Sequence, residues 1–322
     1  MINYIFRRLI QTLVVIVALS FFCFYLMTLM PGDPVDLMVQ SNPRITAEDI
    51  VRLRALYGLD QPAHVRYGRW VKDLLQGDFG YSRTYRIPVT ELMGPKLINT
   101  FVLSVAALML SLAIAVPLGI LTALKPNSRF DTVVNFFAFA GISAPTFWLG
   151  MVLILVFAVG FKILPASGTF TIGEEFGFWG GLWDRAKYLA LPAATLAHIE
   201  IGVFLRFTRS AMMEALRQDF IRTARAKGLA RWQVVIDHAF RNALLPLITI
   251  LALSLGGVFS GATITETVFA YQGVGKLVYD SIIANDFNVA MVSFLISVSM
   301  ILFFNLVADI LYGFADPRIS YR

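Results

Sequence analysis

The string Gly273-Val274-Gly275-Lys276 comes closest to a nucleotide-binding motif in this sequence. A phosphate-binding loop follows the pattern G-x-x-x-x-G-K-[ST], because backbone N–H groups hold the phosphates and the final hydroxyl holds magnesium. Ala270 stands where the first glycine is required, and Leu277 replaces the hydroxyl residue. The chain is therefore expected to bind no nucleotide of its own.

The sequence also lacks the patterns that carry out covalent chemistry or bind metals. It has neither an H-E-x-x-H zinc helix nor a G-x-S-x-G nucleophile turn. Cys23 is the single cysteine, which excludes a disulfide framework and a multi-cysteine metal site. The histidines, His64, His198 and His238, are too scattered to indicate a metal cluster. We expect a non-catalytic chain that holds no cofactor or metal.

The strongest local pattern lies in segment 208–241, which is rich in basic residues. Apolar residues fall there at helical spacing, and they are Met213, Leu216, Phe220 and Ala224. Gly228, preceded by Lys227, suits a left-handed helix cap. Two interpretations stay open: the helix lies on a membrane surface, or it inserts into a cleft on a soluble partner. The small residues Ala224 and Gly228 favour insertion, because a partner's surface can approach the backbone there.

Composition indicates the class of protein that carries these features. The chain has 322 residues, of which 57% are hydrophobic and 15% charged, and its mean hydropathy is +0.70. Soluble domains are about 45–50% apolar and about 25% charged. The composition argues against a disordered chain or a soluble enzyme and favours a protein of the lipid bilayer. The net charge of +6 then reflects basic cytoplasmic loops, and no nucleic-acid partner is expected.

Six apolar runs are long enough to cross a bilayer, whose core of about 30 Å needs about 20 helical residues. These runs are Leu9–Met30, Thr100–Leu124, Val133–Phe161, Tyr188–Phe207, Leu244–Phe269 and Val289–Phe314. The first run is too long for the core of a signal peptide, so we interpret it as a retained anchor. The sequence therefore predicts an all-α polytopic membrane protein with six transmembrane helices.

Basic residues predict the orientation and the organisation of the chain. Arg7 and Arg8 precede the first run, and segment 208–241 lies on the same side, so the positive-inside rule places both termini in the cytoplasm. Residues 1–30 then form the cytoplasmic amino end and first helix, residues 31–99 an extracytoplasmic segment, and residues 100–322 a five-helix core that contains the connection 208–241.

The segment 31–99 is expected to be ordered. Thr46 with Asp49 predicts a capped helix. A second helix is expected near Pro62, with an apolar stripe of Tyr67, Trp70, Val71 and Leu74. This segment either covers the outer mouth of the core or offers a docking surface to an external partner, and the two roles are compatible.

Polar residues inside the apolar runs are candidates for a substrate pathway, because they are costly in a membrane and often line a cavity. Glu200 is one candidate, with pairing to a neighbouring helix as the alternative. His198 lies two residues away, so the two side chains point about 200° apart on a helix. Ser260 and Thr263 are further candidates, with helix packing as the alternative.

Two neighbouring strings resemble the signature loop of binding-protein-dependent ABC importer permeases, most of all the dipeptide and oligopeptide branch. They are Arg222-Thr223-Ala224-Arg225-Ala226-Lys227-Gly228-Leu229 and His238-Ala239-Phe240-Arg241-Asn242-Ala243-Leu244-Leu245-Pro246. Further matches lie along the whole chain, and they include Phe6-Arg7-Arg8-Leu9, Pro31-Gly32-Asp33-Pro34, Gly77-Asp78-Phe79-Gly80, Glu266-Thr267-Val268-Phe269 and Asp316-Pro317-Arg318. The general loop begins E-A-A, whereas Arg222 and Thr223 stand here, so the role of that glutamate does not carry over.

The resemblance implies a permease subunit in the plasma (inner) membrane of a bacterium or archaeon. It implies a second, homologous permease subunit, two ATP-binding subunits that carry ATP and Mg, and an extracytoplasmic solute-binding protein that delivers peptides or similar small solutes. The residues that it implies for contact with an ATP-binding subunit are Phe220, Arg222, Thr223, Ala224, Lys227 and Gly228.

Other readings stay open beside this one. Related importers carry nickel, glutathione or saccharides, and the sequence does not identify the cargo. An ion-coupled secondary transporter would need a relay of intramembrane carboxylates, for which Glu200 and Asp309 are the candidates. A membrane-embedded enzyme would need a nucleophile or metal set, and an assembly or sensor protein of the same fold would not move solute.

Overall fold

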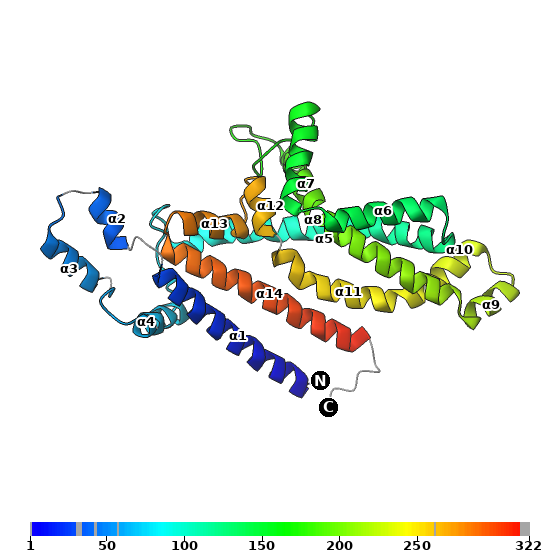
Figure 1. The fold of residues 1–322 in the computed structure, drawn as a ribbon, viewed down its shortest axis with the longest axis horizontal. Helices are drawn as coiled ribbons and strands as arrows, with labels where there is room; N and C mark the ends of the chain where they lie inside the picture. Colours follow the sequence, from blue (N-terminus) through cyan, green and yellow to red (C-terminus); the bar gives the residue numbers. More distant parts are fainter. Residues whose placement is uncertain (1, 30–33, 42–43, 57, 261, 316–322) are drawn as a thin grey trace.

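The computed structural model describes residues 2–29, 34–41, 44–56, 58–260 and 262–315, and most of these residues lie in helices joined by loops. No strand occurs within them, and an isolated bridge joins Tyr81 to Pro88. The long helices α1 (Ile2–Thr28), α5 (Val89–Leu124) and α14 (Phe287–Ala315) run roughly along the long axis of the molecule, as does the later part of α8 (Phe178–Leu216) (Figure 1). The all-α prediction is therefore confirmed.

Four predicted spans are confirmed by helices that are long and apolar enough to cross a membrane. Within the described residues these helices are Phe6–Thr28, Val89–Leu124, Phe178–Leu216 and Phe287–Ile310. A fifth span results if α6 (Arg129–Ser143) and the helical segment Thr146–Gly160 are counted together. The predicted span Leu244–Phe269 falls on α11 (Arg241–Ser260) and α12 (Ala262–Val268), and residue 261 lies outside the described residues. The count of six stays a prediction.

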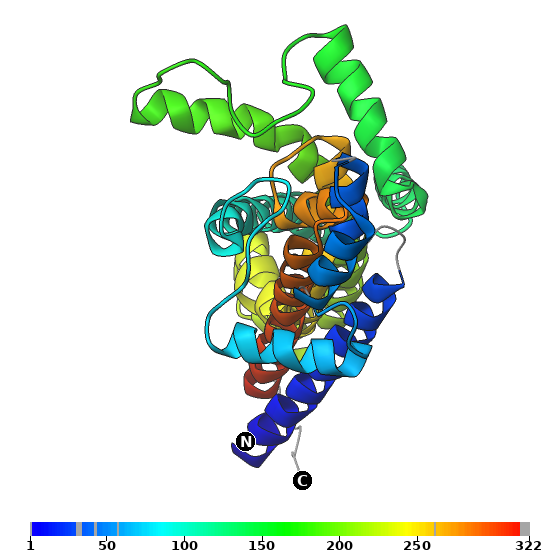
Figure 2. The same cartoon turned by 90° about the vertical axis from the view of Figure 1, so that its left-hand side faces the viewer.

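The third predicted span, Val133–Phe161, is not one straight helix. It bends by 108° between α6 and a second part that consists of α7 (Thr146–Leu153) and the π-helix η1 (Ile154–Gly160). Ala144 takes an extended conformation at the bend, because a proline follows it and disfavours the helical region. Figure 2 shows α7 and the first turns of α8 extending away from the remaining helices.

The outer segment contains α2 (Pro34–Ser41), α3 (Ala47–Leu56) and α4 (Ala63–Leu75). The predicted cap of α3 is confirmed, since Asp49 N–H donates to Thr46 Oγ1 at 3.3 Å and Thr46 N–H donates to the Asp49 carboxylate at 3.0 Å. The Thr46 hydroxyl also donates to the Asp49 carboxylate at 2.7 Å, and this bond, together with that from the Thr46 N–H, lowers the pKa of Asp49. The predicted helix after Pro62 is α4, and its Tyr67 hydroxyl lies 2.8 Å from the hydroxyl of Ser20 on α1.

Helices α5, α6 and α8 approach one another closely at small residues. A Cβ atom added to Gly119 of α5 would lie 2.6 Å from Thr208 of α8, and one added to Gly202 of α8 would lie 2.7 Å from the Ala138 carbonyl of α6. Glycines of this kind let membrane helices pack backbone against backbone. These contacts place α8 at the centre of the three.

The last helices are interrupted rather than continuous. Helix α11 and, further along the chain, α13 (Val274–Ile283) both pack on α14, whereas α12 between them packs on α7 and α8. The amino end of α1 is joined to the far part of α14 by an ion pair of 3.3 Å between Arg8 and Asp309. Asp309 therefore has a basic partner on a neighbouring helix.

Candidate functional site

Helix α9 (Asp219–Ala226) lies at the end of the molecule opposite to α2 and α3 (Figure 1). The predicted amphipathic helix from Met213 to Ala224 is divided in the structure, because α8 ends at Leu216 and α9 begins after Gln218. The break rotates the two parts relative to each other. As a result Phe220 is exposed, while Ile221, which was not singled out in the sequence, faces the body of the protein.

The inner face of α9 rests on a buried apolar cluster. Ile221 is 1% exposed and Ala224 is 4% exposed. Both pack in a cluster with the end of α5, through Ala123, and with the π-helix η2 (Val234–Phe240), through Val234 and Val235. The small side chain of Ala224 thus packs against this protein's own body, and its contact with a partner stays a prediction.

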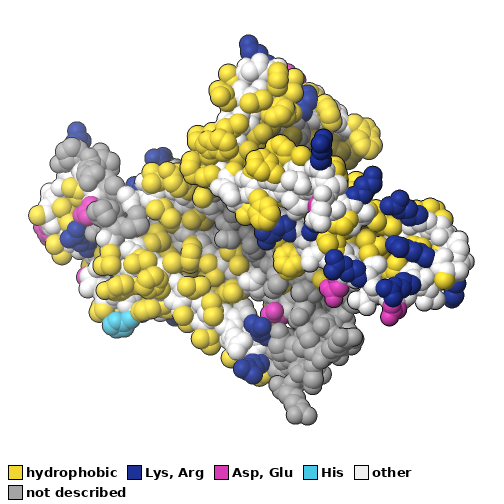
Figure 3. Space-filling model, turned by 45° about the vertical axis from the view of Figure 1, so that its right-hand side comes forward, with side chains coloured by type: hydrophobic (Ala, Val, Ile, Leu, Met, Phe, Trp, Pro, Cys, Tyr) yellow, Lys and Arg dark blue, Asp and Glu magenta, His cyan; other side chains and the backbone are white. Residues whose placement is uncertain are grey.

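The outer face of α9 is basic. Arg222, Thr223, Arg225 and Lys227 are exposed, and Arg222 forms an exposed ion pair of 3.3 Å with Asp219. Figure 3 shows Lys and Arg side chains gathered at the end of the molecule that carries α9 and α10 (Arg231–Gln233). An exposed ion pair contributes little stability, so this face is available for charge contacts with another surface.

Gly228 ends this helix as predicted. Its φ angle is +74°, and nothing lies within 4 Å of an added Cβ atom. Its N–H donates to the Arg225 carbonyl at 3.0 Å, which turns the chain away after Lys227. Glycine is required here by the left-handed conformation and not by lack of space.

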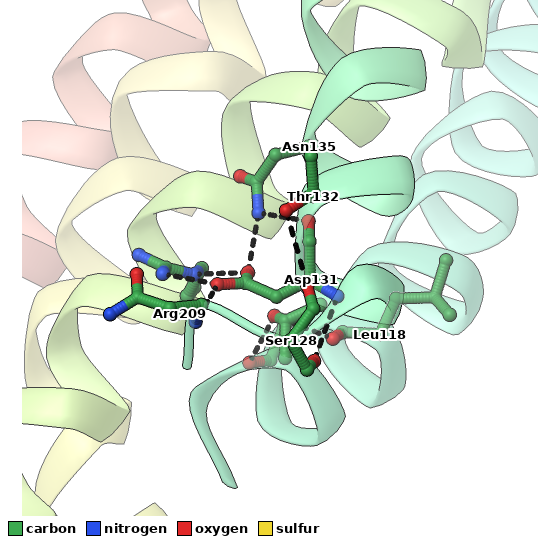
Figure 4. Close-up of polar contacts among 9 residues, drawn as sticks. Leu118, Ser128, Asp131, Thr132, Asn135 and Arg209 are labelled. Carbon is green, nitrogen blue, oxygen red and sulfur yellow. Dashed lines mark hydrogen bonds and ion pairs between the residues drawn. The ribbon is translucent and has the colours of Figure 1, made fainter. Parts of the chain in front are cut away.

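A partly buried ion pair joins α6 to α8 near the end of the molecule that carries α9. Arg209 of α8 donates through Nε and Nη2 to the two carboxylate oxygens of Asp131, each at 2.7 Å (Figure 4). Asp131 lies in the first turn of α6, and its N–H donates to the capping hydroxyl of Ser128 at 3.2 Å. This pair was not predicted from the sequence. The spacing of Ser128 and Asp131 is a capping pattern that could have indicated the helix start, but nothing local indicates Arg209.

The pathway candidates lie on different helices. Glu200 of α8 is half-buried, hydrogen-bonds to Ser254 of α11, and has a buried oxygen Oε2 that receives no hydrogen bond from the described residues. Thr263 of α12 lies against Gly275 of α13 and lines a cavity of about 180 Å³ with Thr100 and Ser297. The side chain of Ser260 lies outside the described residues. His198 points to the Ala144 carbonyl, at 3.2 Å, beside the bend of α6 and α7.

Comparison with known proteins identifies the family. Residues 115–321 match the family described as binding-protein-dependent transport system inner membrane component, and residues 1–90 match its amino-terminal counterpart. The chain belongs to this family. It is 39% identical over 319 residues to the oligopeptide transport system permease protein AppB of Bacillus subtilis, which covers 99% of both chains. It is 36% identical over 339 residues to the dipeptide transport system permease protein DppB of Escherichia coli, which covers 100% of both.

The chain is thus a multi-pass membrane component of a transport system, and the family consists of non-catalytic permease subunits. The resemblance read from the sequence is confirmed.

A second carboxylate that the sequence analysis did not select organises the interrupted helices of this permease. Glu266 of α12 is fully buried, and it accepts hydrogen bonds from the Thr100 hydroxyl at 2.6 Å and from the Lys276 N–H at 2.9 Å. The Thr100 hydroxyl oxygen in turn accepts the Val274 N–H at 2.8 Å. A signal existed, because Glu266 is a charged residue inside the predicted fifth span.

The glycine–lysine string that resembles a phosphate loop is explained by the same carboxylate. A Cβ atom at Gly273 would lie 2.1 Å from Glu266 Oε1, and one at Gly275 would lie 2.5 Å from Thr263. Lys276 directs its amine to Asp280 at 2.6 Å. The two glycines of the permease therefore make room for close packing of α12 against α13.

Proposed function

We propose that the chain forms one half of the translocation pathway of an ATP-driven importer for peptides or similar small solutes. The observation that carries this proposal is α9, an exposed basic helix that rests on a buried support at one end of the long apolar helices. The names of the relatives, which refer to oligopeptide and dipeptide transport, support the cargo class. Because the sequence has no phosphate-binding loop, the energy must come from partner subunits.

The proposed partners are a second, homologous permease subunit, two ATP-binding subunits with ATP and Mg, and an extracytoplasmic solute-binding protein. An ATP-binding subunit would contact the exposed residues Phe220, Arg222, Thr223 and Lys227. Ala224 and Ile221 would hold the helix on the permease, and Gly228 would set the direction in which the chain leaves it.

In the proposed mechanism ATP binding moves α9, and the attached helices rock so that the pathway opens first to one side of the membrane and then to the other. Such a cycle is an equilibrium between two conformations that a ligand shifts. The α9 end and both termini are proposed to lie in the cytoplasm, because basic residues gather there. Glu200 and Thr263 are the proposed lining residues, together with Ser260.

The proposal is tested with the assembled complex in proteoliposomes. Uptake of a labelled dipeptide is measured with the solute-binding protein outside and ATP inside, and nickel, glutathione and a disaccharide are assayed in parallel. We expect dipeptide uptake that requires ATP and both kinds of partner. A matched complex with an ATP-binding subunit that cannot hydrolyse ATP is the control. Uptake by this chain alone, driven by an ion gradient without ATP, would contradict the proposal.

A further inference from the structure

The base of α9 is part of a closed circuit of contacts. Helix α8 leads through residues 217–218 into α9, and α9 packs on η2 in an apolar cluster that also contains Ala123 at the end of α5. Helix α5 ends at Leu124, and a short loop leads into α6. Asp131 in the first turn of α6 then binds Arg209, which lies about two turns before the end of α8. This ion pair is a polar contact through which the circuit returns to the helix where it began, beside the direct packing of α5 on α8 at Gly119 and Thr208.

The ion pair fixes both distance and direction. Two parallel hydrogen bonds of 2.7 Å join the planar guanidinium to the carboxylate. The carboxylate also accepts the Asn127 N–H at 2.8 Å and the Asn135 amide at 2.6 Å, as Figure 4 shows in part. The side chain of Asp131 is 5% exposed. A carboxylate held by four donors from α6, its preceding loop and α8 cannot turn without losing several bonds at once.

The other contacts between α6 and α8 follow the first turn of α6: Val134 and Ala138 share an apolar cluster with Phe204 and Leu205, and the last contacts lie toward the end of α6. There Gly202 of α8 meets Ala138 and Ile142, with no space for a side chain. Without the Asp131–Arg209 pair, the first turn of α6 would lose its polar link to α8 and could swing on the loop 125–128. A push on α9 would then be partly absorbed by that swing.

We propose that Asp131 and Arg209 are positioning residues that close the circuit, so that a displacement of α9 moves the adjoining ends of α5, α6 and α8 as one rigid body. This inference rests on the proposed function, in which α9 receives the motion of an ATP-binding subunit. The pair touches no cargo and acts through the helices that it joins. Its effect therefore appears in the amount of cargo moved per ATP hydrolysed.

The first experiment replaces Asp131 by Asn in the assembled complex and measures cargo uptake and ATP hydrolysis in proteoliposomes. We expect ATP hydrolysis to continue while uptake per ATP falls about two- to thirty-fold, the range for residues that couple two distant sites. The matched control is Arg129→Gln, because Arg129 is an exposed charge two residues away. An Asp131→Asn complex that moves as much cargo per ATP as the wild type would overturn the inference.

A second experiment tests the link itself and does not depend on the stability of a single substitution. Cys23 is first replaced by Ser, and Asp131 and Arg209 are both replaced by Cys. The same preparation is assayed before and after treatment with a short bifunctional thiol reagent. Restoration of uptake per ATP by the cross-link is the expected result, because the covalent bond replaces the lost link between α6 and α8. Uptake that stays equally low after cross-linking would overturn the inference.

The wild-type complex, measured in parallel, distinguishes failure of the proposed function from failure of the proposed role of the ion pair. If wild type shows no ATP-dependent uptake, the proposed function fails. If wild type couples ATP to uptake and the Asp131→Asn complex does so equally well, the inference about the ion pair fails alone.

Discussion

Two buried carboxylates, Asp131 at the α9 end and Glu266 at the interruption between α11 and α13, are stabilised in different ways. Asp131 is 4% exposed and is paired with the cationic Arg209. Glu266 is fully buried and is held by the neutral donors Thr100 and the Lys276 N–H. Asp131 connects two long helices, whereas Glu266 locks a tight hairpin of α12 and α13 to α5.

The difference separates two tasks that a transport protein must perform. A charged pair between helices transmits force in a fixed direction. Substitutions in the Asp131–Arg209 pair should therefore mainly lower the amount of cargo moved per ATP hydrolysed. A carboxylate that accepts hydrogen bonds from an interrupted helix holds that irregular segment together. Substitutions of Glu266 should therefore mainly lower the free energy of unfolding. The predictions below test this contrast.

The largest effect is expected for Glu266→Ala. Each buried donor left without an acceptor costs about 1–3 kcal/mol, so the free energy of unfolding should fall by about 3 kcal/mol. Unfolding of the purified protein in detergent micelles measures this loss. Glu91→Ala is the matched control, since Glu91 is an exposed carboxylate on α5. Equal destabilisation by the two substitutions would show that the Glu266 contacts contribute nothing.

Gly228→Glu should reduce coupled uptake about tenfold, which corresponds to about 1.4 kcal/mol, while the chain still inserts into the membrane. The substitution places a strained, acidic residue at the end of the basic helix α9. Gly77→Glu is the matched control, because Gly77 also has a left-handed conformation, with φ +83°, and open space around it. Normal transport by the Gly228→Glu variant would exclude α9 as the coupling element.

Ser128→Ala removes the hydroxyl that caps α6 beside Asp131, and it should have a smaller effect than the substitutions above. Loss of a helix cap costs about 1 kcal/mol, so a small decrease in stability and a partial loss of uptake per ATP are expected together. Thr132→Ala is a suitable comparison, because the Thr132 hydroxyl donates to the Ser128 carbonyl and does not cap the helix. If uptake per ATP stays at the wild-type level although the cap is lost, the Ser128 cap of α6 is not needed for coupling.

The smallest effect is expected at an exposed carboxylate. The Thr46 hydrogen bonds lower the pKa of Asp49 in the folded state. Its stabilisation of α3 is therefore complete above the unfolded pKa of about 4 and is lost as pH falls through the lower folded value. Amide exchange in residues 47–56, corrected for intrinsic rates, should rise at acid pH in the wild type and change less in Asp49→Asn. Identical pH profiles would contradict this role of the cap.

Local features of the structure could be predicted from the sequence, since their determinants are neighbours in the chain. The Thr46–Asp49 cap, the left-handed Gly228 and the helix after Pro62 each depend on a few adjacent residues. The apolar runs predicted four of the long helices for the same reason, because bilayer thickness sets their length.

Features that join distant segments could not be predicted in this way. Arg209 lies 78 residues from Asp131, and Glu266 lies 166 residues from Thr100. No spacing rule connects such pairs before the helices are packed. The bend at Ala144 is an intermediate case, because Pro145 indicates an interruption but its 108° angle depends on tertiary packing.

The interruption before α13 also shows why a short motif can mislead. The first amides of any helix carry partial positive charge and attract an anion. In a phosphate loop these amides bind the phosphates of a nucleotide, whereas in this chain the Lys276 amide donates to the Glu266 carboxylate. Glycines occur at both kinds of site because an anion must come close to the backbone; in this chain the anion is the Glu266 carboxylate, and the Lys276 amine pairs with Asp280 instead.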